Sequence, residues 1–220
     1  MSDTKREVKR YLLPEGRLIN EALFVKDAYK GDKGQPGVPK YKIEIAFDPA
    51  AVTGQGTIED DLINAACDEW GDPAEDAFLN GAIRSPLLNG DRMAEKRTAK
   101  GKPGDAYRGM VVVRADTIYN HEGRDAPGGV YVCGPDAKPI GPAQAGEIYP
   151  GCYGQAVVTI STYLDNRGEQ CLKFYLVGFQ KTRDGERLIK PADYSQLFRP
   201  VGRTAGADGQ PAAGRRSRRG

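Results

Sequence analysis

The sequence contains a single histidine, His121, in 220 residues. Histidine is the usual general base of hydrolase dyads and triads, and it is the commonest metal ligand in proteins. Its scarcity excludes multi-histidine metal centres and argues against most hydrolase active sites. The glycine-rich stretch at 31–37 also lacks the Lys-Ser/Thr pair of a phosphate-binding loop, so we expect no nucleoside triphosphate hydrolysis.

Cysteine is also sparse and widely spaced. The four copies lie 66, 19 and 19 residues apart, at Cys67, Cys133, Cys152 and Cys171. Zinc ribbons and redox motifs need close cysteine pairs, which this spacing does not provide. We therefore expect reduced thiols that pack in the interior as small hydrophobic side chains, and no metal or other cofactor.

Long apolar runs are missing as well. No segment approaches the roughly 18 to 20 apolar residues that span a bilayer, and the N-terminus, Met-Ser-Asp-Thr-Lys-Arg-Glu, is polar. We expect neither a membrane span nor a secretory or transit peptide, and a chain that stays in the cytoplasm. With 39% hydrophobic and 28% charged residues, the chain has the composition of one globular domain.

Basic residues are absent from one long stretch and concentrated elsewhere. Residues 47–83 contain nine acids and no Lys or Arg, whereas residues 26–42 and 92–108 are rich in both. The segment 199–220 has six arginines and one aspartate, a net charge of +5, so residues 1–198 carry −3 of the total of +2. Positive charge is therefore expected in two loops and a tail on a mildly acidic body.

Glycine and proline, with 28 and 15 copies, punctuate the chain at intervals typical of a β-rich domain. The first two expected strands are joined by a glycine- and proline-rich basic loop, and the last two by the hairpin turn Asp165-Asn166-Arg167-Gly168. Strict alternation on the last strand predicts Tyr175 and Phe179 on the face opposite Phe174. The strands are expected at residues 17–29, 40–47, 107–119, 152–164 and 171–181.

The remaining segments predict one helix and one tail. Apolar residues at helical spacing predict an amphipathic helix inserted at about 56–80, with Thr57 as its N-cap and its acids facing solvent. The last residues are Gly, Ala, Pro and Arg without a bulky core former, which predicts disorder. We therefore expect one β-rich domain over 1–198, with an α+β character from the helix, and a disordered Arg-rich tail over 199–220.

Lysine and arginine are interleaved with aromatic residues on several of these elements. Single-stranded nucleic acid is held by positive charge along its phosphates and by aromatic faces on which bases stack. This combination predicts a single-stranded nucleic-acid site. The candidate binding residues are Tyr29, Lys30, Lys33, Lys40, Lys42, Lys96, Arg97, Lys100, Lys102, Tyr107, Arg108, Lys173, Tyr175, Phe179, Lys181, Arg215, Arg216, Arg218 and Arg219.

Four segments in fixed order resemble a known family. They are a Gly/Lys loop between Tyr29 and Tyr41, Pro-Leu-Leu-Asn-Gly-Asp-Arg at 86–92, Ile-Tyr-Pro-Gly-Cys-Tyr-Gly-Gln-Ala at 148–156, and Val-Gly-Phe-Gln-Lys-Thr-Arg-Asp-Gly-Glu at 177–186. Together they resemble the phage-encoded single-stranded DNA-binding proteins of the DUF2815 family, over roughly residues 12 to 190. The third and fourth segments are the most specific.

The resemblance implies an OB-fold-like barrel that binds single-stranded DNA without sequence preference, in phage DNA replication or recombination, in the cytoplasm of the host cell. It leaves phage replication or recombination proteins and a second copy of the chain open as further partners. Many single-stranded DNA-binding proteins end in an acidic tail, but this chain ends Gly-Arg-Arg-Ser-Arg-Arg-Gly. We expect such a basic tail to add sequence-independent phosphate contacts.

Two other functions remain open from the residues alone. A phage structural or assembly protein could use a similar β-rich domain without binding DNA. A Mg²⁺-dependent nuclease or resolvase could hold metal on Asp91 and Asp105, although both lie in sequences typical of turns. The non-catalytic DNA-binding protein is the main hypothesis, the structural protein is second and the nuclease third.

Overall fold

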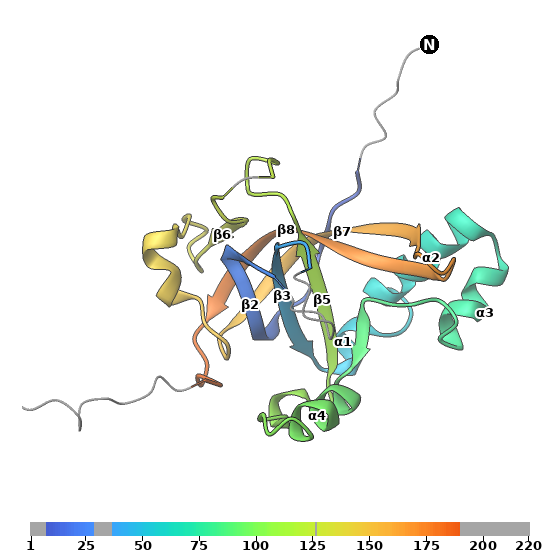
Figure 1. Ribbon diagram of the computed structural model, residues 1–220, viewed down its shortest axis with the longest axis horizontal. Coiled ribbons are helices and arrows are strands. Elements are labelled where there is room, and N and C mark those ends of the chain that lie inside the picture. Colours follow the sequence, from blue (N-terminus) through green and yellow to red (C-terminus); the bar gives the residue numbers. More distant parts are fainter. Residues whose placement is uncertain (1–7, 29–36, 126, 190–220) are drawn as a thin grey trace, which may run out of the picture. The chain divides into compact units, whose positions relative to one another are not determined.

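The computed structural model describes residues 8–28, 37–125 and 127–189 of the chain (Figure 1). The chain divides into two units, Met1–Ile189 and Lys190–Gly220. The second unit lies outside the described residues, as does the expected tail with its boundary at residue 198.

The described residues form a β-rich domain with one mixed sheet. All five expected strands are confirmed, and three short strands are added to them (Figure 1). The strands are β1 (Tyr11–Leu12), β2 (Gly16–Asp27), β3 (Lys40–Phe47), β4 (Leu87–Asn89), β5 (Val111–Thr117), β6 (Tyr131–Cys133), β7 (Tyr153–Leu164) and β8 (Gln170–Arg183).

Five of these strands close into a ring. The pairing runs β7-β2-β3-β5-β8 and returns to β7, because β8 pairs with β5 on one side and with β7 on the other. The β5–β8 contact is parallel, whereas β2–β3, β3–β5 and β7–β8 are antiparallel. The hairpin turn between β7 and β8 is confirmed, with Gly168 at a φ of 79° and the Asp165 carboxylate accepting from two backbone amides.

The two faces of β5 contact different apolar clusters, because successive side chains alternate across a strand. Val113 and Ala115 point into the ring and pack with Ile43 and Phe174 in the main core. Val112 points outward and belongs to a smaller cluster on the outside of the sheet. Part of the outer face of the sheet is therefore covered by this second apolar cluster.

Most of the helices lie in the part of the sequence that connects β3 to β5. They are α1 (Pro49–Val52), α2 (Ile58–Trp70), α3 (Pro73–Leu79) and α4 (Gly90–Thr98), with 3₁₀ turns η1 (Asp105–Tyr107) and η2 (Pro142–Glu147). The predicted N-cap is confirmed, since the Thr57 side chain accepts from the Glu59 amide. The single helix expected over 56–80 is wrong: Gly71, at a φ of 83°, ends α2, and Pro73 starts α3.

Helix α4 replaces the first part of the expected middle basic loop. The Asn89 side chain accepts from the Arg92 amide at 2.9 Å and caps its first turn. A Cβ at Gly90 would lie 2.0 Å from the Tyr107 carbonyl oxygen, so only glycine permits this close approach to the chain after the helix. Buried Ala94 joins Val112 in the outer cluster, and α4 therefore covers one end of the outer sheet face.

A bulge in β8 changes the direction of its last side chains. Val157 pairs with Gly178 and Val158 with Leu176, so Val177 is an extra residue in the ladder. The strict alternation expected along β8 is therefore wrong after this point. Phe179 is only 2% exposed and packs in the main core on the same side as Phe174, instead of sharing the outer face with Tyr175.

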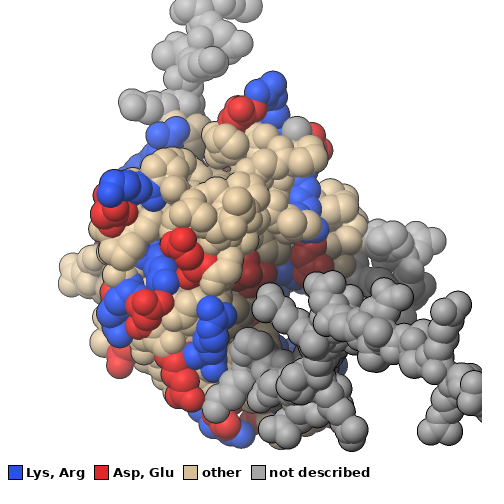
Figure 2. Space-filling view, turned by 90° about the vertical axis from the view of Figure 1, so that its left-hand side faces the viewer, with Lys and Arg blue, Asp and Glu red and all other residues tan. Residues whose placement is uncertain are grey.

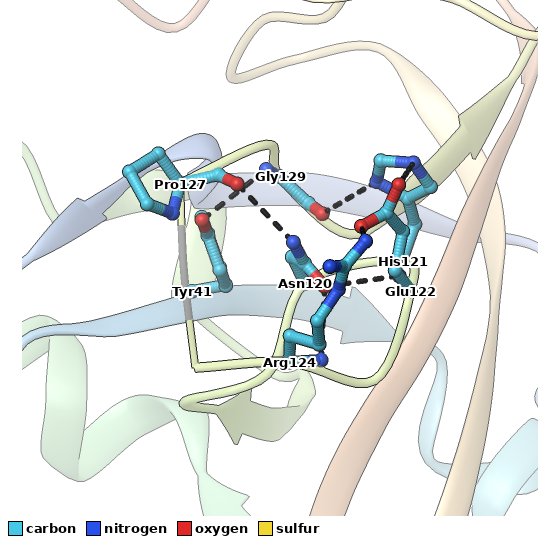
Figure 3. Close-up of polar contacts among 7 residues, drawn as sticks. All are labelled: Tyr41, Asn120, His121, Glu122, Arg124, Pro127 and Gly129. Atoms are coloured by element: carbon cyan, nitrogen blue, oxygen red, sulfur yellow. Dashed lines mark hydrogen bonds and ion pairs between the residues drawn. The ribbon is translucent and has the colours of Figure 1, made fainter.

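The loop between β5 and β6 is held together by polar contacts around Asn120 (Figure 3). The Asn120 side-chain oxygen Oδ1 accepts from the backbone amides of Glu122 and Arg124, and the side-chain Nδ2 donates to the Pro127 carbonyl at 3.1 Å. The Gly129 amide donates to the hydroxyl of Tyr41 on β3. The sole histidine therefore lies in an internally bonded loop, where its ring contacts the Gly129 carbonyl.

Two further expectations concern thiols and membranes. All four cysteines are free, with Cys133, Cys152 and Cys171 buried and Cys67 half-buried, which confirms the interior packing of thiols. Across residues 8–28, 37–125 and 127–189, no helix has the length and apolar character needed to cross a membrane.

Candidate nucleic-acid interface

A continuous groove crosses the outer face of the sheet between α4 and the β7–β8 hairpin, which lie at the bottom and the right of Figure 1. It consists of two adjoining cavities of about 850 and 390 Å³. Both cavities are lined by Arg84, Ser85, Leu88 and Arg114, so these residues form the junction. We call the larger cavity the α4 end of the groove and the smaller one the hairpin end.

The α4 end is strongly basic. Arg92, Lys96 and Lys100 follow one another at four-residue spacing, which places them in one row along the helix and the turn after it. Lys102 lines the same cavity. Among the residues that the structure describes, none of these four cations forms an ion pair.

Arg97 has a different role in the α4 end. Its Nε donates to the Pro103 carbonyl at 2.8 Å, and its guanidinium lies 4.8 Å from the centre of the Tyr107 ring. Tyr107 itself is 2% exposed beneath the helix, and burial raises the pKa of its hydroxyl. Arg97 and Tyr107 thus fasten α4 to the turn that follows it.

The hairpin end contains cations that are already paired with carboxylates. Asp116 on β5 binds both Lys40 and Lys173, with N–O distances of 3.2 and 2.5 Å. Arg84 binds Glu169 at 2.6 Å and lies 3.5 Å from Asp165, both next to the hairpin turn. These pairs leave this part of the groove close to neutral.

The junction between the two ends is also an ion pair. Arg114 donates from Nε and Nη2 to the same oxygen of Glu44, at 2.9 and 2.7 Å. Glu44 is buried, while the Arg114 side chain remains half exposed on the groove floor. The exposed part of the Arg114 side chain therefore lines the groove, while Glu44 balances its positive charge.

Two aromatic rings are exposed at the hairpin end. Tyr163 is 43% exposed near the end of β7, and Tyr175 is 39% exposed on β8. The Lys173 ammonium lies 4.4 Å from the centre of the Tyr175 ring and holds it in place. Burial lowers the pKa of Lys173, and the neighbouring Asp116 carboxylate opposes this shift. The rings thus stand beside a desolvated, charge-balanced cluster.

The structure brings only part of the predicted site together. Seven of the predicted residues line the groove, and the others either lie elsewhere or fall outside the described residues. Those in the groove are Lys40, Lys96, Arg97, Lys100, Lys102, Lys173 and Tyr175. Those outside the described residues are Tyr29, Lys30, Lys33, Arg215, Arg216, Arg218 and Arg219.

Five predicted residues have other contacts. Lys42 pairs with the neighbouring Asp27, and Arg108 lies 3.7 Å from Asp105. Lys181 is nearly buried, with its ammonium donating to the Glu147 carbonyl at 2.9 Å. Tyr107 and Phe179 are buried in the two apolar clusters, so neither ring offers a face on which a base could stack.

Sequence reasoning missed four groove residues: Arg84, Arg92, Arg114 and Tyr163. Arg114 and Tyr163 had a usable signal, since each stands on an expected strand at a position opposite to the inward apolar residues. Arg92 shares the four-residue spacing of the basic row. Arg84 had no local signal, because it reaches the groove only through a parallel bridge between its segment and Cys171 on β8.

The two most specific motifs of the family resemblance contact each other away from the groove. The Tyr149 hydroxyl donates to Asp184 at 2.7 Å, and the Gly185 amide donates back to that hydroxyl. A Cβ at Gly151 would lie 2.0 Å from the Glu186 carbonyl oxygen. We call residues 149–153 and 183–187 the clamp, because they join the start of β7 to the end of β8.

The face on the left of Figure 1, which Figure 2 turns toward the viewer, has no stripe of one charge. Acidic and basic side chains alternate on it (Figure 2). Ion pairs such as Lys138–Asp136 and Lys181–Asp184 belong to this part of the chain, close to η2 and the end of β8. The α4 end of the groove differs from this face because its lysines and Arg92 have no carboxylate partner among the described residues.

The acids considered for a metal site each contact another part of the chain. The Asp91 carboxylate accepts from the Gly109 amide at 2.9 Å, and Asp105 is almost fully exposed beside Arg108. Within the described part of the chain, no group of three or more His, Cys, Asp or Glu side chains is placed to hold a metal ion.

Comparisons with known proteins identify relatives. The family model described as "Enterobacter phage Enc34, ssDNA-binding protein" matches residues 15–202. No curated protein matches by sequence.

Solved structures give the same fold. The single-stranded DNA-binding protein of bacteriophage Enc34, in a C-terminal truncation, aligns with a TM-score of 0.57 and 18% identity over 81% of this chain and 88% of that one. The same phage's protein in complex with ssDNA gives 0.55 and 18% over 81% and 89%. The gp2.5 single-stranded DNA-binding protein of bacteriophage T7 gives 0.51 and 11% over 90% and 100%.

Proposed function

From its match over residues 15–202, the chain belongs to the family of the Enterobacter phage Enc34 single-stranded DNA-binding protein, and we propose that its groove is the DNA-binding site. The protein binds single-stranded DNA in phage DNA replication. The observation that carries the proposed site is the groove itself, which joins a row of unpaired cations to two exposed tyrosines on one face of the sheet.

The chemistry of the groove suits a strand without sequence preference. Cations attract every phosphate equally, and each base has a π-face that can stack on tyrosine, for roughly 1 to 3 kcal/mol per base. Reading a sequence would need donors and acceptors directed at base edges. The groove instead offers charge and aromatic surface.

The ring of strands supports an OB-type barrel. In OB-folds, oligonucleotides bind on the face of the second and third strands and on the loops between strands one and two and between strands four and five. In chain order the ring strands are β2, β3, β5, β7 and β8, so β3 and β5 are the second and third strands, and both contribute to the groove. The β7–β8 turn joins the fourth and fifth, and the loop from β2 to β3 contains the predicted Lys30 and Lys33, outside the described residues.

The proposed role is a non-catalytic coat that protects single strands during phage replication and recombination. Binding along phosphates and bases covers the strand, which keeps nucleases away and prevents re-annealing. The proposal needs no cofactor, because every contact it uses comes from side chains.

The test is fluorescence anisotropy of labelled oligo-dT, oligo-dA and a matched duplex across a salt series. The full-length chain and a version that ends at Pro200 are compared. We expect tight binding of both single strands that falls steeply with salt and survives the truncation. Binding that disappears with the tail would place the site on the arginines instead of the groove.

A further inference from the structure

We propose that the two ends of the groove hold different parts of the strand: the α4 end binds phosphates, and the hairpin end binds bases. This inference rests on the proposed single-stranded DNA function and adds a division of labour within it. It follows from where the structure places carboxylates relative to the cations.

The row on α4 is costly unless an anion binds it. Like charges four residues apart destabilise a helix by roughly 0.2 to 0.5 kcal/mol per pair. Arg92 and Lys96 form one such pair within α4, and Lys100 continues the row in the turn after the helix. The acids nearby form no ion pair with this row. On the helix, Asp91 bonds the Gly109 amide and Glu95 does not line the groove. Two other acids line the cavity, but Glu59 bonds the Gly54 amide and Glu44 pairs with Arg114. Evenly spaced, uncompensated cations suit a ligand whose negative charges also repeat.

The row is also held rigidly in place. Ala94 is buried on the opposite side of α4, and Gly90 makes a close backbone contact with the Tyr107 segment. The Arg97 guanidinium, on a neighbouring face, ties the helix to Pro103. The cations therefore project from a fixed support, so little backbone ordering has to accompany phosphate binding.

In the hairpin end, by contrast, the cations already have carboxylate partners. Carboxylates lie within 4 Å of its cations: Asp116 binds Lys40 and Lys173, and Glu169 and Asp165 lie beside Arg84. At the junction, Arg114 is paired with Glu44. A phosphate that entered would meet Asp116, which lines this cavity, and would have to compete with the other carboxylates for the cations. An uncharged base meets no such opposition.

The exposed rings complete the base site. Lys173 packs against the Tyr175 ring and fixes its orientation, while the ring keeps 39% of its surface open. Tyr163 is exposed in the same cavity. Two rings beside a neutral, partly desolvated floor provide stacking surfaces without attracting a phosphate into their place.

The experiment uses the full-length chain with two oligonucleotides of equal length, oligo-dT and an abasic deoxyribose-phosphate strand. Binding is measured across a salt series for wild type and for two multiple variants. The first is Lys96→Gln/Lys100→Gln/Lys102→Gln, and the second is Tyr163→Leu/Tyr175→Leu. Far-UV circular dichroism and thermal unfolding establish that each variant is folded.

The two variants are expected to fail in different ways. Each phosphate contact contributes about 0.7 to the salt slope for single strands, so the lysine variant should lose about 2 from that slope on both oligonucleotides. The tyrosine variant should bind oligo-dT roughly tenfold or more weakly. Its affinity for the abasic strand and its salt slope should match those of wild type.

A matched control removes three exposed cations outside the groove, Lys9→Gln/Arg124→Gln/Lys138→Gln. It changes net charge by the same amount and should leave the slope within about 0.7 of wild type. If wild type binds oligo-dT but the lysine variant keeps the full slope, or if both variants lose slope equally, the division of labour is wrong. If wild type binds neither oligonucleotide, the proposed function itself fails.

Discussion

The groove and the clamp have the same ingredients and use them differently. In the clamp, the charged groups of Lys181 and Arg187 lie 5.2 and 3.9 Å from the centre of the Tyr149 ring, and the Tyr149 hydroxyl is bonded to Asp184. In the α4 end of the groove, Arg92, Lys96, Lys100 and Lys102 have no carboxylate partner among the described residues. Tyrosine beside lysine or arginine is therefore not a sign of an interface by itself. What matters is whether the chain already supplies the partners.

This comparison explains why the most specific family motifs are not in the groove. The clamp needs Gly151 and Gly185 for close backbone contact, and it needs Tyr149 for a hydroxyl at one position. Such steric demands restrict the residues that fit. Phosphate binding restricts them less, because any lysine or arginine within reach can provide the charge.

The largest expected effect is on the clamp. Gly151→Ala adds a Cβ 2.0 Å from the Glu186 carbonyl oxygen, at a residue with a φ of 117°. Combined backbone strain and overpacking should lower the free energy of unfolding by about 2 to 5 kcal/mol, measured by urea denaturation. Gly141→Ala is the control, because its Cβ would meet no atom within 4 Å. If Gly151→Ala and Gly141→Ala were equally stable, the close backbone contact at Gly151 would not stabilise the fold.

A matched pair of tyrosines tests the comparison directly. Tyr175→Leu should weaken oligo-dT binding by about 1 to 3 kcal/mol through loss of stacking, with little change in stability. Tyr153→Leu removes the ring that lies 3.4 Å from the Arg183 guanidinium, and should cost about 0.5 to 2 kcal/mol of stability with binding unchanged. Anisotropy and urea denaturation are measured on both variants. Weaker binding by Tyr153→Leu with unchanged binding by Tyr175→Leu would contradict the assignment.

A smaller effect is expected from the carboxylate that the hairpin end uses to balance its charge. Asp116→Asn frees Lys40 and Lys173 from their common partner, so phosphates should meet less opposition there. We expect roughly two- to fivefold tighter oligo-dT binding and a steeper salt slope, in line with the modest worth of partly exposed ion pairs. Asp136→Asn, which alters only the pair with Lys138, serves as control. Weaker binding by Asp116→Asn would contradict the assignment.

The smallest effect concerns pH. The Lys181 ammonium, and then the Tyr149 hydroxyl, hold the pKa of Asp184 below its usual value of 3.8. A carboxyl with a lowered pKa in the folded state stabilises the fold above its usual pKa, and that contribution is lost as pH falls through the lowered value. Wild type should therefore be slightly more stable than Asp184→Asn at pH 6, and the difference should shrink as pH falls below 3.8. A difference that persisted at low pH would show that charge is not its source.

Local patterns in the sequence predicted much of the β framework. Alternation located β3, Asp165 to Gly168 located the hairpin, and Thr57 located the start of α2. These features depend on residues that are close in sequence, so they can be recognised without knowing the fold. The break at Gly71-Asp72-Pro73 was also visible in principle, since glycine and proline there end one helix and start another.

The groove could not be predicted from such local patterns. The charge of Arg84 is balanced by Glu169, 85 residues away, and Arg114 by Glu44, 70 residues away. The bulge at Val177 turned Phe179 inward because the pairing with β7 required it.

The sequence by itself determined that the chain is β-rich, that its thiols are interior, and that basic and aromatic residues are plentiful enough for single-stranded DNA. Only the tertiary structure decided which of those residues share a surface and which of their charges are left unpaired. The physical reason is range: strand periodicity and helix caps act within a few residues along the chain, whereas charge balance and exposure depend on neighbours that only folding brings together.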